Sequence, residues 1–496
     1  MSWGMGNTQA EGPVLIASNR GPVSFSRDDA GRLSARRGGG GMVSGLSSVA
    51  GASDLVWVCA ALSDDDRAAA RAAHGGVLDP GQTGSGAAVR MLDVPPEVFQ
   101  RAYNSVANST LWFVHHMLYD TPNQPSFGPG FDRDWAAFRR YNEMFAAALA
   151  DAAGGADRGG APAAAVIQDY HLCLAPLLLA QTAPGVRIAH FSHTPWAPPD
   201  YFRMLPDQIR REVLAGILGA DHAGFLCRRW ADAFVDCCEA FLDAKADSER
   251  RQVSYAGRVT SIGVHPLGVD AGLLRARASE ADVLSRMAAI TSATGGRKLI
   301  VRVDRTELSK NIVRGLLAYR ELLRVHREWH GNVVHVAFAY PSRQDLREYR
   351  EYTAAVQRLA AEIEAEFATP GWSPLLLEVN DDYPRSLAAC RLADVLLVNP
   401  IRDGMNLVAK EGPILSDHGC AVVLSTEAGA AAELGAHALM VNPFDISATA
   451  RALHEALTMS AGERGRRAAA LAATAAAMPP SRWLAEQLEA LGRTAG

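Results

Sequence analysis

A dense polar segment follows one apolar run of this sequence. Residues 401–412 read IRDGMNLVAKEG and come directly after VLLVNP (395–400). If the apolar run is a buried strand, a tight turn follows it and a helix begins near Asn406. The N–H groups at that helix start would favour a phosphate, while Asp403 and Glu411 could accept hydrogen bonds from sugar hydroxyls. The segment therefore indicates a nucleotide-sugar site, with a simple capped helix as the alternative.

Three cationic residues follow other apolar runs. Arg305 and Lys310 lie just after KLIVRV (298–303), and Arg343 comes shortly after VVHVAFA (333–339). A guanidinium and an ammonium that converge with helix N-terminal N–H groups form a good diphosphate site. Each residue taken singly would more often be a solvated surface residue. Their joint placement at strand ends favours an anion site.

Two signatures of other nucleotide sites are missing from the sequence. It contains no G-x-x-x-x-G-K-[ST], which argues against a P-loop nucleotide triphosphatase. It contains no G-x-G-x-x-G after a strand, which weakens the case for a dinucleotide-dependent dehydrogenase.

The first apolar run, VLIAS (14–18), leads into Asn-Arg-Gly-Pro, which places Arg20 at a strand end. Four consecutive glycines follow in RRGGGGMVSG (36–45), among them Gly40 and Gly41. Glycines let main-chain N–H groups approach an anion closely. This loop is therefore a candidate for phosphate or sugar contact, and a flexible linker is the alternative.

Further polar side chains follow the next apolar runs. Asp169 comes after AAVIQ (164–168), and His193 ends the run RIAHFSH. The two could hydrogen-bond sugar hydroxyls or handle a proton, although a strand-end histidine is often only structural. Tyr103 and Trp112 are aromatic rings among amides and would suit a sugar, unless they belong to a core helix. Neither metal-ligand spacing nor a G-x-S-x-G hydrolase turn is present.

Short apolar runs alternate with helical patterns along the whole chain, which indicates parallel sheets covered on both faces. About four such units lie on either side of residue ~280, so we expect an α/β protein with two doubly wound, Rossmann-like domains. The expected domains are 1–268, with a terminal helix at 478–496 packing back on it, and 269–477. Ligands bind outside the carboxyl ends of such strands, so the expected active site is the cleft between the two domains.

Composition excludes several classes of protein. The 496 residues carry a formal net charge of −5, which gives no reason to expect nucleic acid or an anionic membrane as partner. The seven cysteines include no Cys-x-x-Cys pair and fit reduced thiols of a cytoplasmic protein. The N-terminus lacks the pattern of a signal peptide, and no apolar stretch is long enough for a membrane helix. A homo-oligomer is left open.

Together these motifs resemble trehalose-6-phosphate synthases, the retaining GT-B glycosyltransferases of family 20. The resemblance covers roughly residues 14–490. It depends on SNR, DYH, HTPWAPPDYFRMLP, R-x-x-x-x-SK and DGMNLVAKE. One motif alone would indicate only a GT-B glycosyltransferase, and the motifs of the first half add the subfamily.

The resemblance implies roles for the acceptor residues. Arg20 and Arg343 resemble the arginines that hold the phosphate of glucose 6-phosphate. Tyr103 and Trp112 would lie beside that sugar, and Asp169 would bind its hydroxyls.

It also implies a catalytic and donor set. His193 would lie near the donor glucose, while Arg305 and Lys310 would neutralise the leaving diphosphate. Asp403 would bind glucose hydroxyls, and Glu411 would bind the ribose. The donor-binding set is completed by the glycine loop and the residues after Asp403: Gly40, Gly41, Gly404, Met405, Asn406, Leu407 and Val408.

The sequence departs from the family near the expected base site. The segment EVNDDYPRSL (378–387) carries Asp381, Asp382 and Ser386, where the resemblance leads us to expect apolar side chains. A carboxylate can accept two N–H bonds from guanine but finds no such edge on uracil. We therefore hypothesise that the chain accepts GDP-glucose as well as, or in preference to, UDP-glucose.

The reaction implied by the resemblance joins glucose from a nucleoside-diphosphate glucose to glucose 6-phosphate with retention, giving α,α-trehalose 6-phosphate. No metal and no cofactor are expected, since the cations would stabilise the leaving group. Two alternatives remain: a related transferase with another acceptor, such as a pseudo-sugar phosphate, and a nucleotide-sugar sensor without catalysis.

Overall fold

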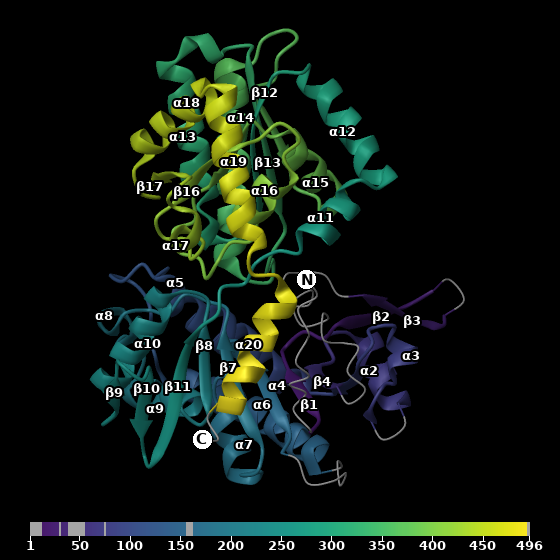
Figure 1. The fold of residues 1–496 in the computed structure, drawn as a ribbon, viewed down its shortest axis with the longest axis vertical. Helices are drawn as coiled ribbons and strands as arrows, with labels where there is room; N and C mark the ends of the chain where they lie inside the picture. Colours follow the sequence, from purple (N-terminus) through teal and green to yellow (C-terminus); the bar gives the residue numbers. More distant parts are fainter. Residues whose placement is uncertain (1–11, 29–30, 38–54, 74–75, 155–161, 494–496) are drawn as a thin grey trace, which may run out of the picture. The chain divides into compact units, whose positions relative to one another are not determined.

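The computed structural model describes residues 12–28, 31–37, 55–73, 76–154 and 162–493 (Figure 1). The chain folds into two compact units. Unit 1 comprises residues 1–266 and 480–496, and unit 2 comprises 267–479. The chain passes from unit 1 to unit 2 after residue 266 and returns after residue 479. The sequence predicts these boundaries after residues 268 and 477.

Unit 1 is built on a nine-stranded sheet. In spatial order its strands are β5 (Ala88–Leu92), β4 (Leu55–Ala60), β1 (Val14–Ala17), β6 (Ala164–Gln168), β7 (Arg187–Ser192), β8 (His222–Phe225), β11 (Arg258–Val264), β10 (Gln252–Tyr255) and β9 (Lys245–Asp247). The strands from β5 to β11 are parallel to one another, and β10 pairs antiparallel with both of its neighbours, β11 and β9. The first six strands have the 3-2-1-4-5-6 order of a Rossmann fold, which reverses between β1 and β6.

The helices of unit 1 cover this sheet, and a hairpin lies beside it. They are α2 (Asp64–Ala72), α3 (Pro80–Thr83), α4 (Pro96–Gln100), η2 (Arg101–Leu111), α5 (Trp112–His116), α6 (Pro129–Gly154), η3 (Tyr170–Leu172), α7 (Ala175–Thr182), α8 (Pro199–Phe202), α9 (Asp207–Ile217), α10 (Arg228–Phe241) and α20 (Pro480–Arg493). The hairpin is β2 (Val23–Arg27) with β3 (Leu33–Arg37). Helix α6 packs on β1 and β4, and on α7 and η2.

The last helix of the chain, α20, packs on β6, β7 and β8 (Figure 1). Its Trp483 is fully buried. The indole meets the ring of Phe191 edge-on, with ring centroids 4.9 Å apart, and lies 5.6 Å from the ring of His193. The final helix is therefore part of the core beside a predicted site residue.

Unit 2 is built on a six-stranded, fully parallel sheet. In spatial order the strands are β14 (Leu375–Glu378), β13 (Val333–Tyr340), β12 (Lys298–Arg305), β15 (Val395–Val398), β16 (Ala421–Ser425) and β17 (Leu439–Val441). Their sequence order is again 3-2-1-4-5-6, and it reverses between β12 and β15. Buried continuous runs such as VLLV and AVVLS form these strands because both faces are covered by helices.

The helices of unit 2 form two packed groups. One consists of α13 (Ile312–Val325), α14 (Arg347–Phe367) and α18 (Ile446–Thr458), and the other of α11 (Ala271–Ala278), α12 (Ala281–Thr294), α15 (Tyr383–Leu392), α16 (Val408–Leu415) and α19 (Ala461–Ala476). Figure 1 shows α13 and α18 on one side of the strands, and α12 and α15 on the other. The remaining turns are η4 (Leu308–Lys310), η5 (Arg327–Trp329) and α17 (Ala431–Leu434).

One expected helix start lies close to the observed one. The helix expected near Asn406 is α16, and it begins at Val408. Asn406 has φ of 71°, in the left-handed region that a right-handed helix excludes. The delay lengthens the loop between β15 and α16.

Two other expectations bear on the class of protein. All seven cysteines are buried and none forms a disulfide, as predicted. Within the described ranges, no helix is long and apolar enough to cross a membrane.

Candidate active site

Sheet topology brings the predicted residues to two switch points. In unit 1, Arg20 follows β1 and Asp169 follows β6, and these two strands are neighbours. In unit 2, Arg305 ends β12 and Asp403 follows β15, which are also neighbours. Crevices for ligands open outside the carboxyl ends of strands where the order reverses. Each unit therefore offers a crevice of its own at its switch point.

Asp169 is held in a strained backbone conformation, with φ of 72° and ψ of 171°. Its N–H donates to the Phe191 carbonyl at 2.7 Å, and its Oδ1 accepts from the His193 N–H at 3.1 Å. These bonds tie the end of β6 to the end of β7. Strain of this kind persists only where the surroundings impose it and is common at functional sites.

His193 is a neutral hydrogen-bonding group. Burial, with a smaller effect from His190, lowers the pKa of His193 to about 3. Its Nε2 lies 2.7 Å from Gln168 Oε1, so Nε2 carries the proton and Nδ1 can accept one hydrogen bond. Of the two roles left open by the sequence, this favours binding a hydroxyl over transferring a proton at neutral pH.

Arg20 is exposed at the end of β1. Within the described part of the chain, its guanidinium has no hydrogen bond or ion pair. The loop that carries it is fixed by its neighbours, because Ser18 Oγ donates to the Arg20 carbonyl at 2.6 Å and Tyr141 donates to Asn19 Oδ1 at 2.6 Å. A free guanidinium on a rigid loop is suited to bind an anion from solution.

The two predicted sugar-binding rings belong to one helical segment formed by η2 and α5. Tyr103 stacks between Phe99 and His171, at centroid distances of 5.1 and 5.6 Å. Trp112 stacks on His116 at 3.8 Å. Both Tyr103 and Trp112 are only partly buried, so part of each side chain is packed and part is accessible.

In unit 2, Lys310 is joined to Asp403. Lys310 Nζ lies 2.5 Å from Asp403 Oδ2, and Asn406 Nδ2 donates to the same oxygen at 3.1 Å. Burial alone would lower the pKa of Lys310, but the surrounding carboxylates, Asp403 first, outweigh it and raise the pKa. The ammonium therefore stays charged beside the loop that follows β15.

A buried carboxylate, Glu307, was missed by the sequence analysis. Arg305 Nη1 lies 3.2 Å from Glu307 Oε1, and Ser342 Oγ donates to the same oxygen at 2.9 Å. Arg343 follows Ser342 directly and donates to Tyr349 Oη at 2.6 Å. The only signal in the sequence is the acid between the arginine and lysine of RTELSK.

The loop after Asp403 presents main-chain N–H groups. The N–H groups of Met405, Asn406 and Leu407 donate to no described residue. The loop is packed closely, since a Cβ added to Gly429 would lie 1.8 Å from the Gly404 carbonyl oxygen. Three free donors in succession before a helix start are suited to bind an anion or hydroxyls.

Glu411 lies in the first turn of α16, three residues after Val408. Burial raises its pKa to about 7. Among the described residues, no side chain or N–H group forms a hydrogen bond or ion pair with its carboxylate. The neighbouring Lys410 points elsewhere, donating to both oxygens of Glu433 at 2.8 and 2.9 Å.

The two carboxylates expected near the nucleotide base differ in whether other residues already occupy them. Asp382 caps α15 by accepting from the Arg385 N–H, and both of its carboxylate oxygens accept from Arg286 Nε, at 2.7 and 2.8 Å. Ser386 donates to the Tyr383 carbonyl. Asp381 is exposed, so it is the acid free to meet a base. Gly40 and Gly41 lie outside the described residues.

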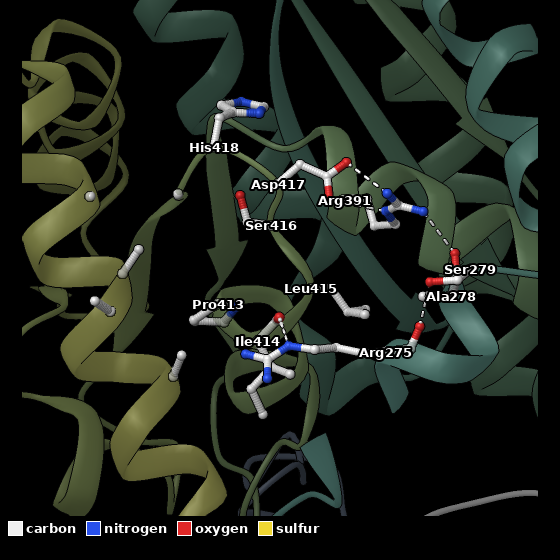
Figure 2. A pocket seen from close by; sticks show the side chains of 15 residues that line it. Arg275, Ala278, Ser279, Arg391, Pro413, Ile414, Leu415, Ser416, Asp417 and His418 are labelled. Atoms are coloured by element: carbon white, nitrogen blue, oxygen red, sulfur yellow. Dashed lines mark hydrogen bonds and ion pairs between the residues drawn. The ribbon is translucent and has the colours of Figure 1, made fainter. Parts of the chain in front are cut away.

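Figure 2 shows a cavity of unit 2, of about 520 Å³, whose lining residues are not the ones described above. It is lined by the ends of α15 and α16 that face away from the predicted donor loop. Arg391 donates to both carboxylate oxygens of Asp417 and to the Ala278 carbonyl, and Arg275 donates to the Ile414 carbonyl. Its charges are largely engaged with one another, and none of the predicted site residues lines it.

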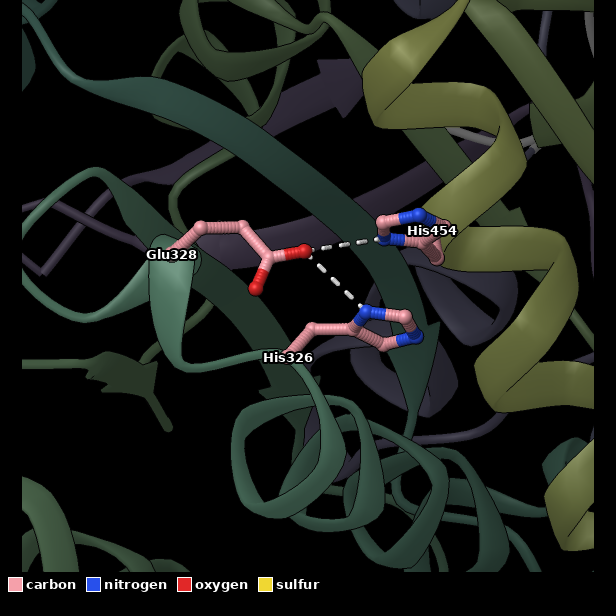
Figure 3. A group of neighbouring side chains, drawn as sticks. All are labelled: His326, Glu328 and His454. Carbon is pink, nitrogen blue, oxygen red and sulfur yellow. Dashed lines mark hydrogen bonds and ion pairs between the residues drawn. The ribbon is translucent and has the colours of Figure 1, made fainter.

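One group of described side chains has the spacing of a metal site: His326, Glu328 and His454 (Figure 3). The two imidazoles stack with centroids 3.6 Å apart and planes within 11°. Nδ1 of His454 accepts from the Trp329 indole N–H at 3.1 Å. Stacked rings do not direct their lone pairs at a common point, and the indole occupies one of them, so we assign no metal to this group.

Comparison with known proteins identifies the family. Residues 12–493 match the model of glycosyltransferase family 20. The chain belongs to this family. Its architecture is accordingly GT-B, with two Rossmann-like domains. A structure of trehalose-6-phosphate from E. coli bound with UDP-2-fluoro glucose matches with a TM-score of 0.82 and 25% identity, over 97% of this chain and 98% of that one.

Three curated family members are similar at comparable levels. The bifunctional trehalose-6-phosphate synthase/phosphatase of Thermoproteus tenax is 31% identical over 92% of this chain. The UDP-forming alpha,alpha-trehalose-phosphate synthase of Emericella nidulans is 30% identical over 92% of this chain and 88% of its own length. The validamine 7-phosphate valienyltransferase of Streptomyces hygroscopicus subsp. jinggangensis is 31% identical over 96% of this chain and 94% of its own. The chain spans 60% of the T. tenax protein.

Proposed function

We propose that this family member transfers glucose, with retention, from a nucleoside-diphosphate glucose to glucose 6-phosphate, forming α,α-trehalose 6-phosphate. One observation carries the proposal: each Rossmann-like unit has, at its switch point, a cation suited to bind a phosphate. Arg20, exposed after β1, has no partner among the described residues, and Lys310 with Asp403 joins β12 to β15. A reaction between two phosphorylated sugars needs both groups.

The chemistry follows from the charges. A nucleoside diphosphate leaves readily once Arg305, Lys310 and the free N–H groups after Asp403 stabilise its growing negative charge. No general acid is then required, in keeping with the low pKa of His193. We infer front-face attack, in which the departing phosphate oxygen takes the proton of the acceptor hydroxyl. The C1–O bond to phosphate breaks as the new glycosidic bond forms.

The remaining residues bind the two sugars. In this proposal the Asp403 carboxylate and His193 Nδ1 accept hydrogen bonds from hydroxyls of the donor glucose, and Asp169 binds the acceptor hydroxyls. Arg343 joins Arg20 on the acceptor phosphate, and the rings of Tyr103 and Trp112 pack beside the acceptor. With seven unpaired thiols in the core, we place the enzyme in a reducing compartment such as the cytoplasm.

A coupled assay of nucleoside-diphosphate release tests the proposal. UDP-glucose and GDP-glucose are each offered with glucose 6-phosphate, glucose or no acceptor, and the product is identified by mass and by NMR of its anomeric protons. We expect release to depend on glucose 6-phosphate and to yield the α,α-linked product. Release without acceptor dependence, or binding without turnover, would reject it.

A second candidate is transfer to validamine 7-phosphate. It is favoured by the valienyltransferase relative, which this chain matches over 94% of that protein's length at 31% identity. The assay above distinguishes the two when validamine 7-phosphate is added to the acceptors. A kcat/KM at least ten times higher with glucose 6-phosphate supports the first function, and the reverse supports the second, since a factor of ten is about 1.4 kcal/mol of transition-state binding.

Use of GDP-glucose is proposed from Asp381 alone, because Asp382 is engaged with Arg286. We expect turnover with GDP-glucose, and Asp381→Asn should lower kcat/KM for that donor roughly tenfold, as expected for one lost charge-assisted contact. The variant should leave UDP-glucose unchanged, because uracil offers no paired donors to a carboxylate. Equal losses with both donors, or no turnover of GDP-glucose, would contradict this role.

The pKa of Glu411 predicts a pH dependence of nucleotide binding. Only the ionised carboxylate accepts hydrogen bonds from both ribose hydroxyls, and with a pKa of about 7 it is mostly protonated at pH 5.5. Affinity for the nucleoside diphosphate should therefore rise roughly tenfold from pH 5.5 to 7.5 and then level off. The control is Glu411→Gln, whose affinity is measured by calorimetry over the same pH range. This substitution removes the ionisable group at position 411, while the phosphate of the nucleotide still changes its protonation. The same pH slope in both proteins would exclude the assignment.

A further inference from the structure

We propose that Glu307 is a positioning residue, whose buried carboxylate holds Arg305 and Arg343 in place for the two substrate phosphates without contacting either substrate. The inference rests on the proposed function, which assigns Arg305 to the leaving diphosphate and Arg343 to the acceptor phosphate. It adds a link between these two assignments.

The link is visible in the hydrogen bonds of two adjacent loops. Glu307 follows β12, and its side chain is fully buried. Ser342, which follows β13, donates to Glu307 Oε1 at 2.9 Å and directly precedes Arg343. The neighbouring Thr306 N–H also donates to the Tyr340 carbonyl at 2.6 Å. One carboxylate thus joins the loop of the diphosphate cation to the loop of the acceptor cation.

The charges around Glu307 also favour a positioning role. Burial alone would raise the pKa of Glu307, but the cations Arg305, Arg343 and Lys310 outweigh it and lower the pKa to about 2. The carboxylate is therefore ionised at every working pH. Three cations lie close enough to stabilise it, so it offsets their mutual repulsion when no phosphate is bound.

Arg305 depends on this carboxylate for its orientation. Its side chain is 55% exposed, and Glu307 is the one described carboxylate that pairs with it. A long cation half in solvent samples many rotamers. Arg343 is held with φ of 45°, a conformation disfavoured for arginine, and its neighbour Ser342 is tied to the same carboxylate. Removing the negative charge would leave both guanidinium groups less well placed.

The test is Glu307→Gln, which keeps the shape and an oxygen for Ser342 but removes the charge. Inorganic pyrophosphate and the nucleoside diphosphate should bind with unchanged or up to roughly tenfold tighter Kd, because a buried negative charge beside an anion site is gone. The turnover number should nevertheless fall ~10- to 100-fold, because Arg305 is no longer oriented. A purely structural role would weaken binding and turnover together.

Three further variants keep the test decisive. Glu307→Asp retains the charge and should recover part of the lost turnover. Ser342→Ala frees one carboxylate oxygen without changing charge and should lower turnover a few-fold without tightening pyrophosphate binding, which tests the inference if Glu307→Gln does not fold. Glu351→Gln, in an exposed pair with Arg347 on α14, is the matched control and should change neither quantity.

The outcomes separate this inference from the proposed function. If the wild type transfers glucose and Glu307→Gln keeps its turnover number, the inference fails and the function stands. If the wild type transfers glucose to no acceptor, the proposed function is wrong. The positioning role of Glu307 is then tested by comparing the Kd for pyrophosphate of Glu307→Gln with that of the wild type. Weaker pyrophosphate binding by Glu307→Gln overturns the positioning role in either case.

Discussion

Alanine in place of Lys310 or Arg305 is expected to lower the turnover number ~10²- to 10³-fold, the usual cost of removing one preorganised electrostatic stabiliser. Lys310 has the larger expected effect, because its ammonium is mostly buried, with a side chain only 16% exposed, and lies 2.5 Å from Asp403. Its removal leaves that carboxylate without its cation beside the departing diphosphate. Steady-state kinetics with saturating donor measures the change.

An arginine outside the predicted site serves as the control for the loss of one positive charge. Arg347 lies on α14 of the same unit, 79% exposed and paired with Glu351. Arg347→Ala should leave the turnover number within about twofold, since exposed pairs contribute little. Near-normal rates for Lys310→Ala and Arg305→Ala would contradict their assignment to the leaving group.

Replacement of Arg20 by alanine is expected to raise the KM for glucose 6-phosphate roughly 30- to 100-fold, as about 2–3 kcal/mol is typical for a hydrogen-bonded contact to a charged group. The free guanidinium after β1 has no partner among the described residues, so its loss should leave the fold intact. The effect should be confined to the phosphorylated acceptor. Residual turnover with unphosphorylated glucose at high concentration should be the same in the variant and the wild type, because that acceptor has no phosphate for Arg20 to bind.

Arg228 provides the comparison in unit 1. It lies on α10, 79% exposed, beside Asp232, and Arg228→Ala should not alter either KM. If Arg20→Ala impairs glucose and glucose 6-phosphate equally, Arg20 does not bind the acceptor phosphate.

The ends of parallel strands were the most predictable part of this molecule. Arg20, Asp169, Arg305 and Asp403 could be placed in advance because apolar runs reveal parallel strands, and the chemistry of such sheets lies at their carboxyl ends. The strand order in both units matched the Rossmann pattern for the same reason. Periodicity in the sequence is sufficient for these features.

Features that depend on contacts between distant segments were not predictable. Glu307 looks like a surface acid until the loop after β13 places Ser342 and Arg343 beside it. Asp382 looked available for a base, but Arg286, 96 residues away in the sequence, occupies it. The late start of α16 depends on the backbone of Asn406, since a positive φ at a residue other than glycine leaves little trace in the sequence.

The position of α20 has a consequence for how the protein is made. Unit 2 interrupts the chain of unit 1, and Trp483 fills the core over β7. While the ribosome is still translating residues 267–479, the face of β6, β7 and β8 that receives α20 is uncovered, and the nascent first unit exposes apolar surface. The sequence of unit 2 is thus complete before that of unit 1, and the core of unit 1 is complete only once α20 has emerged.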